Sequence, residues 1–144
     1  MKYRFITALL IFSFYPATVF ANSLDWANGL WALDPQYASK EELLEYSCKT
    51  NPLTISIDKE KNVFKSKHPN SDANKAAIIS SSANTLEIMY ENEERVMDNG
   101  ELQVWVMYFL DKDNFSWVRQ DWIIDGQITG GTSPRMRCPT YLIS

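Results

Sequence analysis

Residues 101–124 read "ELQVWVMYFLDKDNFSWVRQDWII" and contain the longest run of alternating apolar side chains in the chain. A period of two predicts β-strands, and "KDN" at 112–114 predicts a turn between them. The stretch therefore predicts a hairpin of two strands, 101–111 and 115–124. One face of the first strand carries Leu102, Val104, Val106, Tyr108 and Leu110, and the other carries Trp105, Met107 and Phe109. Because both faces are apolar, we expect this strand to be covered on both sides.

Shorter stretches with strand character surround this hairpin. Counting a weaker one at 95–97, they lie at 29–33, 53–58, 63–67, 76–80, 85–91, 95–97, 128 and 135–139. "DNG" at 98–100 predicts a type I′ turn, because Asn-Gly tolerates the two positive φ angles that this turn requires. Ser39 and Glu42 form a capping box that predicts a helix of about two turns. Together these elements predict an all-β protein, a small antiparallel β-barrel of about eight strands with one short N-terminal helix.

The first 21 residues have the features of a secretory signal peptide. Lys2 and Arg4 precede an uncharged run of 16 residues, and Ala21 stands at the cleavage position. The run is shorter than the ~20 apolar residues that a membrane-spanning helix needs. We therefore expect cleavage after Ala21, no membrane insertion afterwards, and one exported domain, 22–144, that is periplasmic or secreted.

The charge of the exported part narrows the choice of partners. Removing the leader takes away two basic residues, which leaves 12 basic against 18 acidic side chains and a net charge of about −6. An acidic surface repels phosphate backbones, so nucleic acid is not an expected partner. A basic protein remains a possible one, although acidity also serves solubility.

Cys48 and Cys138 are the two cysteines of the chain, and both lie in the exported part. In an oxidising compartment a single pair of this kind is expected to form a disulfide. A metal site needs more thiols or histidines at short spacing, and the chain has one histidine, His68. We therefore predict a Cys48–Cys138 bond, no metal site and no cofactor.

Three short motifs carry a resemblance to known exported barrels. They are "GLWALDP" at 29–35, "PLTIS" at 52–56 and "RCP" at 137–139. Their order resembles that of small uncharacterised exported bacterial proteins with a lipocalin-like (calycin) barrel. In lipocalin-like barrels a glycine and a tryptophan lie on the first strand, and the tryptophan plugs the closed end beneath an arginine. The resemblance implies that Gly29 and Trp31 take these structural roles. It assigns the arginine to Arg137 or Arg135, with Arg119 as a weaker candidate.

Catalytic patterns are weak in this sequence. One histidine allows one Ser-His-Asp set at most, and no serine lies in a nucleophile-elbow pattern. The acidic cluster "ENEE" at 91–94 is predicted to be a solvated loop rather than a carboxylate pair in a cleft. We therefore predict no catalytic residues and a protein that is not an enzyme.

Two functions remain as hypotheses. The first is a non-catalytic binding protein that holds a small apolar or amphipathic ligand, with Trp105, Trp117 and Arg119 lining or guarding the mouth of the barrel. Small eight-stranded barrels can hold one such ligand. The alternative is an acidic inhibitor or immunity factor that binds a basic hydrolase such as a lysozyme. A third interpretation places the strand face with Trp105, Met107 and Phe109 in the core. The sequence leaves open whether this face is core or binding surface.

Overall fold

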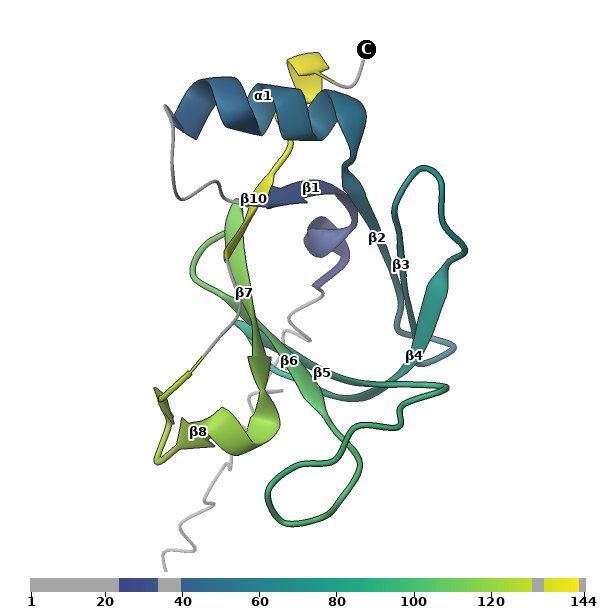
Figure 1. The fold of residues 1–144 in the computed structure, drawn as a ribbon, viewed down its shortest axis with the longest axis vertical. Coiled ribbons are helices and arrows are strands. Elements are labelled where there is room, and N and C mark those ends of the chain that lie inside the picture. Colours follow the sequence, from purple (N-terminus) through teal and green to yellow (C-terminus); the bar gives the residue numbers. More distant parts are fainter. Residues whose placement is uncertain (1–23, 34–39, 131–133, 143–144) are drawn as a thin grey trace, which may run out of the picture.

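Eight antiparallel strands close into a barrel in the computed structural model, which describes residues 24–33, 40–130 and 134–142 (Figure 1). Around the barrel the strands follow the order β1-β10-β7-β6-β5-β4-β3-β2. Their bounds are β1 Gly29–Leu33, β2 Leu53–Asp58, β3 Val63–Lys67, β4 Asn74–Ser81, β5 Thr85–Tyr90, β6 Trp105–Phe109, β7 Asn114–Arg119 and β10 Pro134–Arg137. The predicted fold class, a small antiparallel barrel, is confirmed.

The remaining elements lie outside the barrel wall. The helix α1 (Lys40–Thr50) follows β1, and a two-stranded sheet of β8 (Ile123–Ile124) and β9 (Gln127–Ile128) lies between β7 and β10. Three 3₁₀ turns complete the described elements: η1 Leu24–Ala27, η2 Gln120–Trp122 and η3 Thr140–Leu142. No helix in these ranges is both long and apolar enough to cross a bilayer. The predicted signal peptide, 1–21, and the capping residue Ser39 lie outside the described residues.

Alternation along the strands sorts side chains between the interior and the surface. In β2, Leu53, Ile55 and Ile57 are buried, whereas Thr54 and Ser56 are exposed. The same pattern brings one apolar cluster together inside the barrel. Its fully buried members include Trp31, Phe64, Leu86, Ile88, Met107 and Phe115.

The long strand predicted for 101–111 is shorter in the structure. β6 begins at Trp105, and Leu102 forms only an isolated bridge with Val96. The chain before Trp105 leaves the barrel wall because the backbone N–H of Gln103 donates to the carbonyl of Arg95 within the β5–β6 loop. The expectation of two covered faces holds at the centre of the strand, where Met107 faces inward and Val106 is 1% exposed.

The predicted type I′ turn at 98–100 is wrong. Gly100 has a positive φ of 84°, but Asn99 is not among the described residues with positive φ. The two consecutive positive φ angles instead occur at Asp125 (50°) and Gly126 (75°), which join β8 to β9 as a two-residue loop. This is the loop length at which the type I′ geometry matches the twist of a hairpin.

The helix α1 covers the outer face of β1 and is bonded covalently to the end of the chain. Cys48 and Cys138 form a disulfide, as predicted, with an S–S distance of 2.11 Å. Leu30, Ala32, Leu44 and Leu142 pack around it as a second, smaller apolar cluster. α1 is eleven residues long, which is longer than the two turns expected from the capping box.

We predict that removing this disulfide destabilises the protein strongly. The bond joins residues 90 positions apart, and chain-entropy estimates for such a loop are about 4–5 kcal/mol. The double variant Cys48→Ser/Cys138→Ser should therefore lose on the order of 10 °C or more in Tm in a thermal melt. Reductant should lower the Tm of the parent protein and leave that of the double variant unchanged. Equal melting temperatures for parent and variant would contradict this prediction.

Candidate ligand-binding site at the open end of the barrel

One end of the barrel is closed by Trp31 and Arg137. The two residues are cross-strand partners on β1 and β10, and the Arg137 guanidinium lies 4.3 Å from the centre of the Trp31 ring. Arg137 also donates to the carbonyls of Trp26 (2.7 Å) and Asn28 (3.2 Å), and Trp31 Nε1 donates to the carbonyl of Ala27 (3.0 Å). These bonds hold η1 inside the ring of strands (Figure 1). The end of the barrel near Gly29 is therefore sealed.

Gly29 has a backbone conformation that suits glycine. Its φ is 132°, and a Cβ atom at this position would meet the Arg137 side chain at 3.4 Å. A residue with a side chain would therefore be strained in this backbone conformation. Of the three arginines considered from the sequence, Arg137 is the one that lies over Trp31.

The middle of the barrel is filled by aromatic rings. Phe64, Phe115 and Trp117 pack edge to face, with ring centres 5.6–5.7 Å apart. Trp117 is 8% exposed and belongs to this core. The structure thus places Trp117 below the mouth of the barrel, between the sealed end and the open end.

The open end carries polar side chains on the inner face of the wall. Ser66 is 4% exposed and lies near Tyr90, which packs against the apolar core. Burial raises the pKa of Tyr90 above its ordinary value of 10.0, so its phenol is neutral at physiological pH. Arg135 lies close enough to Tyr90 to interact with it electrostatically. A polar layer of Ser66, Tyr90 and Arg135 therefore lies above the apolar core.

The β5–β6 loop, 91–104, is held against this end by a buried carboxylate. The side chain of Glu93 is 1% exposed and accepts two bonds from the Arg95 guanidinium, at 2.5 and 2.7 Å. It also accepts one from Trp105 Nε1, at 3.1 Å. The ion pair with Arg95 holds the pKa of Glu93 below its ordinary value. The interpretation of "ENEE" as a solvated loop is therefore wrong for Glu93.

A cavity of about 540 Å³ lies between this loop and the start of β4. It is lined by Ala73, Asn74, Lys75, Tyr90, Glu91, Asn92 and Arg95. Volumes of this size suit a small-molecule ligand. Tyr90 takes part both in this cavity and in the polar layer of the barrel interior, so it connects the two.

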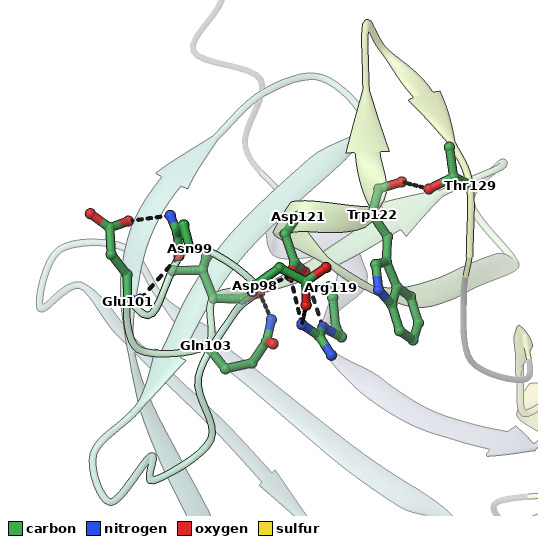
Figure 2. A network of polar contacts seen from close by, with 9 residues as sticks. Asp98, Asn99, Glu101, Gln103, Arg119, Asp121, Trp122 and Thr129 are labelled. Atoms are coloured by element: carbon green, nitrogen blue, oxygen red, sulfur yellow. Dashed lines mark hydrogen bonds and ion pairs between the residues drawn. The ribbon is translucent and has the colours of Figure 1, made fainter.

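Arg119 belongs to a different network (Figure 2). It is the cross-strand partner of Trp105, but its guanidinium makes two bonds to the Asp121 carboxylate and stacks over the Trp122 ring at 5.0 Å. The Asp121 carboxylate also accepts from the backbone N–H of Asp98 in the β5–β6 loop (3.0 Å). The structure therefore places Trp105 at the polar end of the barrel, Trp117 in the core, and Arg119 in a network that fastens the loop to the end of β7.

Sequence reasoning missed Glu93, Tyr90, Ser66 and Arg135 as members of this end. For Arg135 a signal existed, because residues two apart on a strand share a face. Arg137 lies over Trp31, so the spacing alone could have shown that Arg135 faces inward as well. Within the described residues no group of three or more histidine, cysteine or acidic side chains could hold a metal ion.

No family model matches this chain, and no curated protein or solved structure matches it either. The geometry of the open end is therefore the basis for any statement about function.

We predict that Glu93→Gln destabilises the protein in a pH-dependent way. The pKa of Glu93 is lower in the folded protein than its ordinary value of 4.5, so the carboxylate stabilises the fold fully above that pH. The stabilisation is lost as the pH falls through the lowered pKa. The Tm difference between parent and variant should be largest near neutrality and should shrink below about pH 4.5.

The neighbouring variant Glu94→Gln serves as the control, because Glu94 is exposed. It should change Tm little across the same pH series. A Tm difference for Glu93→Gln that stays constant down to acid pH would show that its carboxylate charge does not matter.

Proposed function

We propose that the protein is a non-catalytic, exported binding protein that holds a small ligand at the open end of its barrel. The observation that carries this proposal is the 540 Å³ cavity, one of whose lining residues, Tyr90, packs against the apolar core near Ser66. Ligand sites combine an apolar surface with a few converging polar groups. Of the two ligand types expected from the sequence, the mostly polar lining favours an amphipathic one over a purely apolar one.

Export is part of the proposal. The disulfide is consistent with an oxidising compartment, and the leader-like residues 1–21 support a periplasmic or secreted location. The resemblance to small exported bacterial barrels with a Gly-x-Trp first strand points in the same direction. In this proposal the polar groups bind and orient a ligand and perform no chemical step.

We predict that amphipathic ligands change the fluorescence of Trp105. Its indole contacts Glu93 and Arg95 beside the cavity, so a ligand there alters its surroundings. Titration with a panel of long-chain acids, alcohols and amphipathic dyes should give a saturable change for at least one member. The Trp105→Phe variant should lose most of this change, and the control variant Trp122→Phe should keep it. No response to any member of the panel would contradict the proposed function.

A second candidate function, binding to a basic hydrolase such as a lysozyme, is favoured by the loop surface. We define the loop surface as the exposed apolar side chains Val96, Leu102, Ile124 and Ile128 with the exposed acids Glu94, Asp98, Glu101 and Asp125. The backbone N–H of Asp98 donates to the Asp121 carboxylate, which connects the β5–β6 loop to the segment that precedes β8 (Figure 2). Exposed apolar groups rimmed by charge are typical of protein interfaces.

The second candidate predicts capture of a basic hydrolase that weakens with salt. A pull-down with lysozyme should succeed at low ionic strength and fail at high ionic strength, because screening weakens attraction between opposite charges. Ile124→Ser, within the loop surface, should weaken capture, and the control Leu110→Ser, in the exposed β6–β7 turn, should not. Equal capture by both variants would exclude this surface as the interface.

A further inference from the structure

Arg135 points into the barrel from β10. Its cross-strand partner on β7 is Phe115, which is fully buried in the core. Cross-strand partners share a face of the sheet, so the Arg135 side chain lies on the inner face with Phe115. Its electrostatic neighbour Tyr90 is on β5, and two strands, β7 and β6, separate β10 from β5 around the wall. Arg135 therefore reaches toward Tyr90 across the interior of the barrel.

Arg135 is half-buried and has no ion-pair partner among the described residues. Its Nε atom is buried and has no hydrogen-bond partner. Burial lowers the pKa of Arg135, yet an arginine stays protonated in proteins. Burying a charge and an N–H donor without a partner is costly. The inner face of the barrel therefore contains a cation with an unpartnered N–H donor, which an anionic group of a ligand could satisfy.

The groups around Arg135 suit an anion with two oxygen atoms. The hydroxyls of Tyr90 and Ser66 lie near each other, and each can donate one proton to an acceptor. A carboxylate can accept from a guanidinium and from a hydroxyl at the same time. The apolar tail of a ligand with such a head group would lie against the core beneath, where Ile78 and Trp105 are partly buried.

The two cationic side chains that line the cavity, Arg95 and Lys75, are less suitable than Arg135 as receptors for an anionic head group. Arg95 already donates two bonds to Glu93, and Lys75 is exposed to water. A head group at Lys75 would compete with solvent, whereas a head group at Arg135 replaces missing contacts. Arg135 does not itself line the cavity, but Tyr90 both lines it and interacts with Arg135.

We propose that Arg135 is the receptor for the carboxylate of an anionic amphipathic ligand, with the Tyr90–Ser66 hydroxyl pair as the second donor. This rests on the proposed function, the binding of an amphipathic ligand at the open end. It adds the sign of the ligand's head group and the residue that recognises it.

The test compares two ligands of equal chain length, dodecanoate and dodecanol, by calorimetric titration. The parent protein should bind dodecanoate about tenfold or more tightly than dodecanol, as a charge-assisted bond in a buried site implies. Arg135→Gln should remove this preference and leave dodecanol binding nearly unchanged. Lys49→Gln also removes one positive charge, on the exposed face of α1, and it should keep the preference.

The outcomes separate the two proposals. Equal binding of dodecanoate and dodecanol, with Arg135→Gln unchanged, would overturn the role of Arg135 and leave the proposed function in place. No binding of either ligand, or of any member of the wider panel, would overturn both.

A thermal melt without ligand supplies a second readout. Because the Arg135 Nε–H is buried without a partner, Arg135→Gln should keep or raise the Tm of the free protein. Dodecanoate should raise the Tm of the parent protein more than that of the variant. A large loss of Tm in the free variant would show that Arg135 supports the fold rather than a ligand, which would overturn the proposal.

Discussion

The contact between Arg137 and Trp31 is the constraint on which the rest of this barrel depends. It joins the last strand to the first, at the pair of residues where the sheet closes. The same guanidinium holds the carbonyls of the chain entering β1, so that η1 fills the end of the barrel. This contact seals one end, so the proposed binding site lies at the other end. The two ends of the barrel therefore differ. The sealed end is plugged by Trp31, and the open end carries the polar layer of Ser66, Tyr90 and Arg135.

The packed interior limits where the proposed ligand could bind. Phe64, Phe115 and Trp117 fill the middle of the barrel, so the barrel is not a deep cup. Binding is instead proposed for the upper layer, where Tyr90 and Arg135 lie, and for the cavity beside it. The β5–β6 loop forms one wall of that cavity, and the buried Glu93 carboxylate keeps the loop in place. A shallow site of this kind favours a ligand with a polar head group.

Much of the fold was predictable, because alternating apolar residues and a single pair of cysteines can be recognised directly in the sequence. Leu53, Ile55 and Ile57 face inward as their alternation indicated, and Cys48 bonds Cys138. The site was harder to predict, because periodicity does not show where a strand leaves the wall. Residues 101–104 alternate like the strand that follows, yet the backbone N–H of Gln103 donates to the carbonyl of Arg95 within the β5–β6 loop. Glu93 looks solvated in the sequence, and its burial depends on Arg95 and Trp105. Trp117 and Arg119 share a face, yet one packs in the core and the other pairs with Asp121.

The most direct test of this account is the NMR signal of the arginine Nε–H groups, recorded while dodecanoate is added. The two inward-facing arginines of β10 report on opposite ends of the barrel, Arg137 on the sealed end and Arg135 on the open end. The Arg135 signal should move in a saturable way, whereas the Arg137 signal should stay in place. Saturable binding that leaves the Arg135 signal unchanged, or that moves the Arg137 signal instead, would contradict this account.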